Sequence, residues 1–261
     1  MNDELQYMAK RFSDLSGQAD RKGIILFSDF LSLGEQTLLA QQAKKLASAY
    51  ELFGGYECAE RQMAAFIPDA LFYDARREEG KPFAAGQYPF KCLRILPAHP
   101  KFAEKLTHRD VLGALMSLGL ERNRLGDLIV DGEQILVFAQ DRIVPYLMDS
   151  LSSVRHTAVI LEILEEQCIS YEPHFTEKEA IVTSNRLDAV IAAICKTSRS
   201  ASLKLISEGK IFVNGTESLH NTYYCKQGDI LSIRGFGKVR FGEILGTTKK
   251  DRLKFSYKIY S

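Results

Sequence analysis

The order of apolar segments between residues 90 and 164 constrains the fold most strongly. Four runs have the length and composition of strands, and two carry the three- and four-residue spacing of helices. In chain order we predict Phe90–Leu96 (strand), His108–Leu118 (helix), Asp127–Val130 and Gln134–Ala139 (strands joined by Asp131-Gly132), Asp141–Ser150 (helix) and Val154–Leu164 (strand). The order β-α-β-β-α-β predicts a ferredoxin-like central domain.

The start of the first helix in this segment is marked at Thr107. Its hydroxyl is suited to cap the helix, and Asp110 completes a capping-box-like pair, with Asp in place of the usual Glu or Gln. RNA-recognition domains share this element order and stack bases on aromatic residues of the third strand. The third strand here, Gln134–Ala139, contains a single aromatic residue, so stacking of bases on this sheet is disfavoured.

Residues 1–80 predict a separate N-terminal α/β domain. The run Gly34–Tyr50 places leucines and alanines on one helical face, and Gly54-Gly55 ends it. Tyr56–Pro68 then has the composition of a strand. The charged stretch Asp74–Pro82 has no apolar periodicity and predicts a linker before the central domain.

The C-terminal segment predicts two helices packed on a small β-sheet. Apolar residues recur at helical spacing between Leu187 and Ile194, and a second helix is expected to end at Gly209, a C-cap signal. In a later strand Lys238 and Arg240 alternate with apolar residues, which puts these cations on the solvent side. The whole chain is therefore expected to be α+β, with an N-terminal α/β domain (1–80), a ferredoxin-like, RNA-recognition-like central domain (81–180) and a small C-terminal domain (181–261).

Charge is distributed unevenly along the chain. The chain has a net charge of +1. Residues 1–182 contain 20 Lys and Arg and 27 Asp and Glu, whereas residues 183–261 contain 14 Lys and Arg and 6 Asp and Glu. The two segments carry net charges of −7 and +8. A basic segment fused to an acidic body indicates a polyanionic partner for the basic segment alone.

Composition and motifs disfavour several classes of protein. The chain has no apolar run long enough for a membrane span, and its first residues, Met1–Glu4, are acidic rather than like a secretory signal, so we expect a cytoplasmic protein with no membrane partner. The five cysteines are scattered, and the five histidines are never paired at metal-ligand spacing. No nucleophile elbow or dinucleotide-binding glycine pattern occurs. We therefore expect no metal, no cofactor and no catalytic residue.

Four blocks in the C-terminal segment resemble an RNA-binding domain named after ribosomal small-subunit protein four, called the S-four domain here. They are Arg186-Leu187-Asp188, Ser198-Arg199-Ser200-Ala201, Leu205-Ile206-x-x-Gly209-Lys210-Ile211-x-Val213-Asn214-Gly215 and Gly228-Asp229-x-Leu231. The order and spacing of four separate blocks carry the resemblance. It implies that this segment binds structured RNA.

Further blocks resemble the YlmH family of bacterial S-four proteins. They are Leu106–Leu115, Gly119–Leu128, and Glu60-Arg61 before Phe66-x-Pro68. The resemblance covers the chain from about Gly55 to its end. It implies binding to ribosomal RNA or tRNA on the large ribosomal subunit, translation quality control on stalled nascent chains, and an association with cell division; DNA is not an expected partner.

The resemblance also implies a set of RNA-facing residues. They are Arg186, Ser198, Arg199, Ser200, Lys204, Lys210 and Asn214, with Arg234, Lys238 and Arg240 as a flanking basic set. Ser198 and Ser200 lie at the start of the second helix, where unpaired N–H groups and the helix dipole favour a phosphate. The hypothesis requires that Arg199, Lys204 and Lys210 share a surface and are not held against carboxylates.

Structural roles are the alternatives for several of these residues. Arg186 is also placed to pair with Asp188, Ser198 to act as an N-cap alone, and Asn214 to serve as a turn residue. Asp188 itself is interpreted as structural, because a carboxylate that faces phosphates repels them. Lys238 stands where members of the family often have Arg, which keeps the charge but loses bidentate geometry.

Two other classes of function remain open. S-four domains are also appended to RNA-modifying enzymes such as pseudouridine synthases and RNA methyltransferases, although the sequence lacks their catalytic blocks and their methyl-donor glycine loop. A protein–protein adaptor that uses the acidic N-terminal body is compatible with RNA binding by the C-terminal segment.

Overall fold

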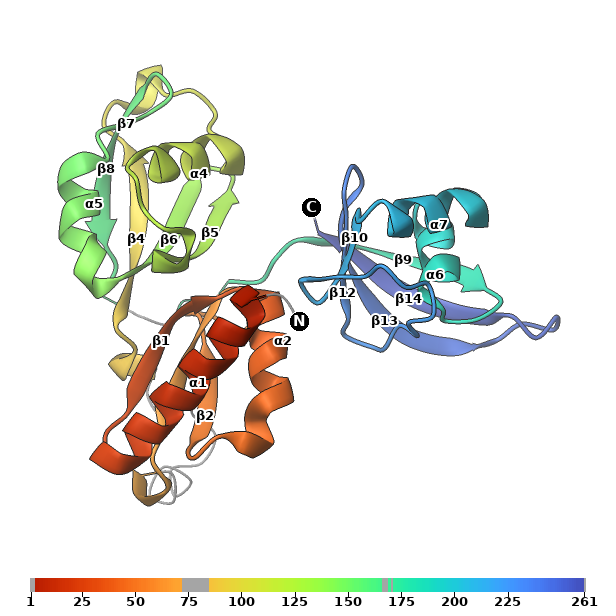
Figure 1. The fold of residues 1–261 in the computed structure, drawn as a ribbon. Helices are drawn as coiled ribbons and strands as arrows, with labels where there is room; N and C mark the ends of the chain where they lie inside the picture. The colour runs from red at the N-terminus through yellow and green to blue at the C-terminus, as the bar shows by residue number, and fades with distance from the viewer. Residues whose placement is uncertain (1–2, 72–84, 166–168, 170, 261) are drawn as a thin grey trace. The chain divides into compact units, whose positions relative to one another are not determined.

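The computed structural model describes residues 3–71, 85–165, 169 and 171–260, and the linker predicted at Asp74–Pro82 lies outside them. Helices and antiparallel sheets form an α+β protein, as expected (Figure 1). The chain divides into two compact units, Met1–Tyr171 and Glu172–Ser261, which are taken in turn. Within the described residues, no helix is long and apolar enough to cross a membrane.

The first unit begins with a small sheet and its helices. Its elements are α1 (Asp3–Lys22), β1 (Leu26–Leu31), α2 (Leu33–Gln42), the 3-10 turn η1 (Ala43–Lys45), β2 (Ala49–Phe53) and β3 (Gln62–Ile67). The strand order is β1-β3-β2, with antiparallel pairs. Phe12 of α1 and Leu39 of α2 are buried with Phe66 of β3, so the two helices pack on one face of this sheet.

The helix expected at Gly34–Tyr50 is shorter than predicted. Ser32 caps α2 and forms a capping box with Glu35, but the α-helix ends at Gln42. Ala49–Phe53 is a strand that pairs with β3 along its whole length. Apolar spacing alone does not separate a short strand from the end of a helix, and here pairing with β3 decides the outcome.

The rest of the first unit follows the predicted order β-α-β-β-α-β. Its elements are η2 (Ala85–Gln87), β4 (Phe90–Pro97), η3 (Pro100–Phe102), α4 (His108–Ser117), η4 (Arg122–Arg124), β5 (Leu125–Asp131), β6 (Gln134–Gln140), η5 (Asp141–Ile143), α5 (Val144–Ser150), β7 (Ser153–Val154) and β8 (Thr157–Ile163). The sheet order is β5-β6-β4-β8-β7. Thr107 caps α4 and Asp110 completes the capping box, which confirms that prediction.

The two sheets of the first unit pack against each other. Phe30 and Met63 of the N-terminal sheet share a buried cluster with Phe90 and Phe138 of the central sheet. Phe138 has no exposed surface, and its ring stacks on Tyr56 at a centroid distance of 5.8 Å. The helices α4 and α5 contribute to a separate cluster on the other face of the central sheet. The N-terminal sheet therefore covers the β5, β6 and β4 part of the face that the helices leave open, while Ile160 of β8 stays 51% exposed.

Two of the blocks that resemble the YlmH family join these sheets. Asp127 accepts hydrogen bonds from Tyr56 Oη at 2.8 Å and from the backbone N–H groups of Glu60 and Arg61 at 2.7 and 3.1 Å. Arg61 Nε donates to the carbonyl oxygen of Leu125 at 3.0 Å. Burial is the main cause that raises the pKa of Asp127. These blocks thus hold the N-terminal sheet on the central one.

The second unit is a six-stranded sheet with two helices. Its elements are β9 (Phe175–Val182), α6 (Leu187–Ile194), α7 (Arg199–Ser207), β10 (Ile211–Val213), β11 (Thr216–Glu217), β12 (Ile230–Ile233), β13 (Gly237–Thr247) and β14 (Leu253–Tyr260). The strand order is β11-β10-β12-β13-β14-β9. Leu187, Ile191 and Ile206 of the helices are buried with Phe241 and Phe255 of the sheet, so α6 and α7 cover one face (Figure 1).

This unit begins earlier than the sequence indicated. β9 pairs with β14 from Phe175 opposite Tyr260 to Val182 opposite Leu253. The domain boundary expected between residues 180 and 181 therefore falls within a strand of the C-terminal sheet. In the sequence, the change in charge and in apolar spacing comes only after β9. That β9 belongs to this sheet follows from its pairing with β14, which lies at the C-terminal end of the unit.

Local signals in this unit behave as predicted. Gly209, Asn214 and Gly215 adopt positive φ angles of 66°, 49° and 75° at the expected C-cap and turn. In β13, Val239 and Phe241 have at most 1% of their surface exposed, and the alternating residues face the other side of the sheet.

Candidate nucleic-acid interface

In the central domain, the middle of the sheet face that RNA-recognition domains use for RNA is covered. Phe138, the single aromatic residue of the third strand, lies between Tyr56 and Phe90 in the cluster shared by the two sheets. This arrangement agrees with the expectation that stacking on this sheet is disfavoured. The part of this face around Phe138 is therefore closed to bases, whereas Ile160 and Glu162 of β8 on the same face remain exposed.

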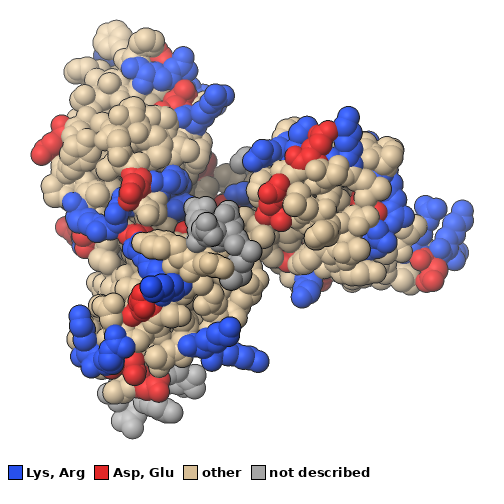
Figure 2. All heavy atoms as spheres, viewed as in Figure 1, with Lys and Arg blue, Asp and Glu red and all other residues tan. Residues whose placement is uncertain are grey.

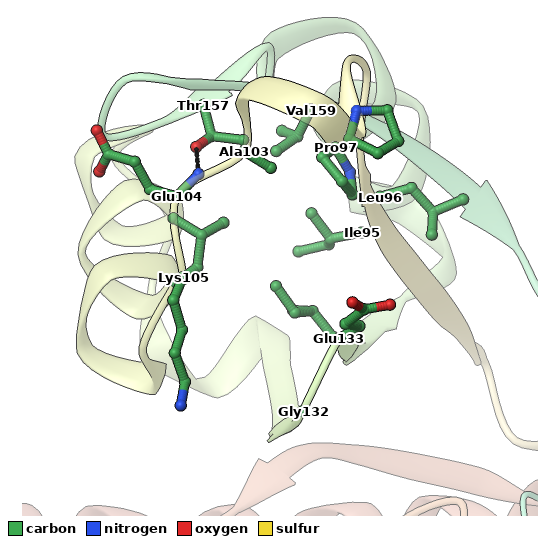
Figure 3. A pocket seen from close by; sticks show the side chains of 13 residues that line it. Ile95, Leu96, Pro97, Ala103, Glu104, Lys105, Gly132, Glu133, Thr157 and Val159 are labelled. Atoms are coloured by element: carbon green, nitrogen blue, oxygen red, sulfur yellow. Dashed lines mark hydrogen bonds between the residues drawn. The ribbon is translucent and has the colours of Figure 1, made fainter.

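A cavity of about 570 Å³ lies in the central domain beside the ends of β4 and β8 (Figure 3). Ile95 and Val159 contribute to its apolar wall, and its charged lining residues are Lys105, Glu104 and Glu133. Because two carboxylates stand against one lysine, the cavity does not favour a polyanion. Among the described residues, no group of three or more His, Cys, Asp or Glu side chains is placed to hold a metal.

The start of the two C-terminal helices is organised by one buried carboxylate. Asp188 is 1% exposed and accepts a hydrogen bond from Arg199 Nε at 2.7 Å and another from Arg186 Nε at 3.1 Å. Burial alone would raise the pKa of Asp188, but the bonds and charges of the two arginines outweigh it and hold the pKa below its usual value. The structural role expected for Asp188, and its pairing with Arg186, are therefore observed.

The first turn of α7 is capped by its own serine. The hydroxyl of Ser198 accepts from the backbone N–H of Ala201 at 3.1 Å and lies 2.9 Å from the hydroxyl of Ser200. Ser198, Arg199 and Ser200 are all exposed. The cap satisfies one N–H group of the helix start, so fewer donors remain for a phosphate than the sequence suggested.

The two lysines expected to continue the RNA track are paired with one carboxylate. Lys210 Nζ lies 2.7 Å from a Glu208 carboxylate oxygen, and Lys204 Nζ lies 3.8 Å from the other. The hydrogen bond and charge of Lys210 are the main causes that lower the pKa of Glu208. With Arg199 held by Asp188, the three cations fail the requirement stated for the hypothesis. A continuous unpaired track through them is wrong, because neighbouring carboxylates offset part of their charge.

Asn214 serves the turn in which it lies. Its Nδ2 donates to Asp229 Oδ1 at 2.8 Å, and its Oδ1 accepts from the backbone N–H of Ile230 at 2.8 Å. Asp229 is buried and also accepts from Tyr223 Oη and from the backbone N–H of Lys226. The amide of Asn214 thus ties two loops together and joins the block that ends at Gly215 to the block that contains Asp229.

The flanking basic residues lie on the sheet face turned away from α6 and α7, called the outer face here. Arg234 and Arg240 lie over the rings of Phe212 and Phe175, at 5.1 and 5.8 Å from the ring centroids. Lys238 lies 5.6 Å from the ring centroid of Tyr260. Sequence reasoning named the three cations but missed the aromatic residues and a fourth cation, Lys258, which lies 5.8 Å from the ring centroid of Phe175. Their common face depends on strand register, which no local pattern reveals.

The contrast in charge persists at the observed boundary. Residues 172–261 hold 15 Lys and Arg against 9 Asp and Glu, a net charge of +6, and residues 1–171 hold 19 against 24, a net charge of −5. Figure 2 shows Lys and Arg side chains over the second unit and at the projecting end of its β13–β14 hairpin. A polyanion is therefore attracted to the second unit more than to the first.

Comparison with known proteins defines the class of the central segment. Residues 88–167 match the family model described as a putative RNA-binding domain in YlmH. The match spans β4 to β8 with α4 and α5. It agrees with the resemblance of residues 106–128 to the YlmH family, and it places a putative RNA-binding domain in a segment for which the sequence predicted no separate RNA site.

Two relatives extend the comparison. Over 231 residues the chain is 29% identical to the ribosome-associated protein quality control protein P2 of Bacillus subtilis (strain 168), a match that covers 88% of this chain and 85% of that protein. Among solved structures, the cell division protein ylmH from Streptococcus pneumoniae is similar at 20% identity and a TM-score of 0.48, which covers 63% of this chain and 93% of that one.

Proposed function

We propose that this chain is a non-enzymatic RNA-binding protein of ribosome-associated quality control, which holds ribosomal RNA or tRNA on the large subunit during rescue of stalled nascent chains. The observation that carries the proposal is the extent of the similarity to the Bacillus subtilis protein, whose name describes ribosome-associated quality control. Because the match covers 88% of this chain, it includes most of both units. Work on the ribosome implies a cytoplasmic location.

The second unit is the proposed S-four domain. In its support, each block of the resemblance has a definite place in the fold: Asp188 joins the starts of α6 and α7, Gly209 ends α7, and Asn214 and Asp229 tie two loops together. The strand order β5-β6-β4-β8, with α4 and α5 on one face, likewise supports a ferredoxin-like arrangement for the central domain.

Arg186 and Arg199 are the proposed phosphate contacts at the start of the two helices. Two guanidinium groups share the single charge of Asp188, so the cluster keeps a net positive charge. The side chain of Arg199 is 52% exposed, and a guanidinium offers donors beyond its Nε to a phosphate. Lys204 and Lys210 are assigned a smaller part, because Glu208 lies against both.

Cosedimentation of the full chain with ribosomal subunits tests this proposal. We expect Arg199→Ala to weaken binding by about tenfold, the loss of a charge-assisted contact. Arg11→Ala is the control, because Arg11 lies outside the segment that matches the RNA-binding family model, is 39% exposed and also lies against a carboxylate, that of Asp29 at 2.6 Å. Equal effects of the two substitutions, or none from either, would contradict the role of the helix starts and favour an adaptor that binds through the acidic first unit.

Salt dependence provides a second measurement of the same proposal. If about four to six phosphates are neutralised, the logarithm of the affinity should fall with the logarithm of salt concentration at a slope of roughly −3 to −5. An affinity that does not change with salt would rule out binding through phosphates.

The non-enzymatic part of the proposal is tested on the bound RNA. After incubation with the chain, with and without a methyl donor, the nucleoside composition of the RNA is expected to stay unchanged. A new methylated nucleoside or pseudouridine would favour the RNA-modifying class instead. An association with cell division rests on the family resemblance alone, and subunit binding does not depend on it.

A further inference from the structure

The outer face of the C-terminal sheet carries two rows of side chains across its strands. Strand pairing places residues of β10, β12, β13, β14 and β9 side by side in a fixed register. The second row, Ile230, Arg240, Lys258 and Glu177, is paired throughout. In the first row Phe212, Ser232 and Lys238 are paired, as are Tyr260 and Phe175, and Lys238 lies 5.6 Å from the ring centroid of Tyr260. Paired residues of antiparallel strands point to the same face, so aromatic rings and cations alternate over one surface.

The rings and cations of this surface touch one another. Phe175 and Tyr260 meet edge to face with centroids 4.9 Å apart, and both Arg240 and Lys258 lie 5.8 Å from the centroid of Phe175. None of these four residues is fully buried. A guanidinium or ammonium over a ring is attracted by the π-electrons and still presents its charge outward.

Three cations of the outer face differ in their partners from the cations of α7 and of the residues that follow it. In the part of the chain that the structure describes, Arg234, Arg240 and Lys258 make no ion pair with a carboxylate, whereas Arg199, Lys204 and Lys210 each do. The Nε of Arg240 is buried without a hydrogen-bond partner among the same residues. Among the described residues, ion pairs therefore do not offset the positive charges of Arg234, Arg240 and Lys258.

We propose that the outer face binds unpaired nucleotides of RNA, a contact that rests on the proposed RNA-binding function and adds a second surface to the helix starts. Bases stack on Phe175, Tyr260 and the guanidinium of Arg240, and phosphates contact Lys258 and Arg234. Aromatic rings interleaved with cations are the pattern by which proteins hold single strands without sequence preference. A duplex keeps its bases stacked inside the helix, so the rings give it no advantage.

Carboxylates mark the margin of this site. Glu177 lies opposite Lys258 in the pairing of β9 with β14, and Glu179 on the same strand lies 2.6 Å from Lys254. Phosphates are repelled along β9. The bound strand is therefore expected to cross β12, β13 and β14, with Phe175 at the limit of the contact.

Binding of two fluorescent RNAs of equal length by the full chain tests the site. The probes are a single-stranded oligoadenylate and a closed hairpin. The charge variant is Arg240→Gln with Lys258→Gln, and the ring variant is Phe175→Leu with Tyr260→Leu. The control is Lys249→Gln with Lys250→Gln, which removes the same charge from the exposed turn between β13 and β14. Unfolding midpoints of all variants are measured alongside.

We expect the ring variant and the charge variant each to weaken oligoadenylate binding by about tenfold or more and to leave hairpin binding within about twofold. In the charge variant, loss of the Lys258 phosphate contact also reduces the magnitude of the salt slope on the single strand by about 0.7. Arg199→Ala is expected to show the opposite preference and weaken hairpin binding more. If a double variant unfolds, Lys258→Gln alone serves, because it alters only one partly exposed side chain.

Three outcomes would overturn the inference. In the first, the outer-face variants bind oligoadenylate as the wild type does. In the second, the control weakens oligoadenylate binding as much as the charge variant does, so that net charge alone matters. In the third, the chain binds an acidic peptide better than either RNA. A wild type that binds the hairpin but not the single strand refutes this site and leaves the proposed function standing. A wild type that binds neither RNA refutes the proposed function.

Discussion

Asp188 sets the geometry of both C-terminal helix starts, because Arg186 of one and Arg199 of the other donate to its carboxylate. The backbone carbonyl of the same residue accepts from the Ser202 hydroxyl at 2.7 Å, which adds a second link between α6 and α7. A residue that repels phosphate thus positions the two side chains proposed to bind it.

We predict that Asp188→Asn lowers the free energy of unfolding by about 1–3 kcal/mol at neutral pH, because two guanidinium groups lose their shared anion. The folded-state pKa of Asp188 is below the unfolded value. Its contribution is therefore complete above the unfolded pKa, near pH 4, and is lost as pH falls through the folded pKa. Urea unfolding of both proteins at pH 7 and near pH 3 measures this. A difference that stays constant between the two pH values would contradict the ionic role.

Neighbouring carboxylates also limit what a basic motif reveals. The spacing of Lys204 and Glu208, four residues apart on a helix, is a signal of pairing that is legible in the sequence. The pairing of Lys210 with the same Glu208 cannot be predicted from the sequence, because it depends on the path of the backbone after the end of α7. Charge counting locates the basic segment, but it does not show which of its cations lack a neighbouring carboxylate.

At the scale of elements, the contact between the two sheets of the first unit depends on Gly126 at the start of β5. A Cβ atom there would lie 2.7 Å from Cε1 of Phe30 and 2.8 Å from Cβ of Phe138. Phe30 and Phe138 have no exposed surface and little room to move.

Gly126→Ala is therefore expected to destabilise the first unit by about 1–3 kcal/mol through overpacking. Gly113→Ala is the matched control, because a Cβ on this exposed glycine of α4 meets nothing within 4 Å. In a helix that change should stabilise by about 0.5–1 kcal/mol. Thermal unfolding of the two variants against the wild type gives the comparison. Equal effects of the two substitutions would refute the packing argument.

Elements with local signals could be predicted, and those decided by distant partners could not. Thr107 marks the start of α4 through its own hydroxyl, and Asn214-Gly215 makes a turn through its own backbone preference. Ala49–Phe53 and Phe175–Val182 are strands because β3 and β14 lie beside them. The same holds for the candidate site. The residues at the helix starts could be predicted because they lie in sequence motifs, whereas the outer face could not, because it depends on which strand residues lie side by side.

At the scale of the whole molecule, the second unit has a core of its own. Its buried cluster draws every member from residues between Ala180 and Ile259. We predict that residues 172–261 fold as an isolated fragment and that residues 181–261, cut at the boundary that the sequence suggested, are less stable because most of β9 is lost. Circular dichroism and thermal unfolding of both fragments decide this. Equal midpoints would mean that β9 contributes nothing to the fold.

The position of β14 between β13 and β9 has a consequence during synthesis on the ribosome. β9 leaves the exit tunnel first, and the residues from 183 to 252 must follow before its partner is available. During that interval the edge of β9 that later pairs with β14 has no native partner. The strand also exposes the apolar side chain of Ile181. Unpaired strand edges of this kind can associate with other chains. The glutamates of β9 keep like strands apart by repulsion while the chain grows.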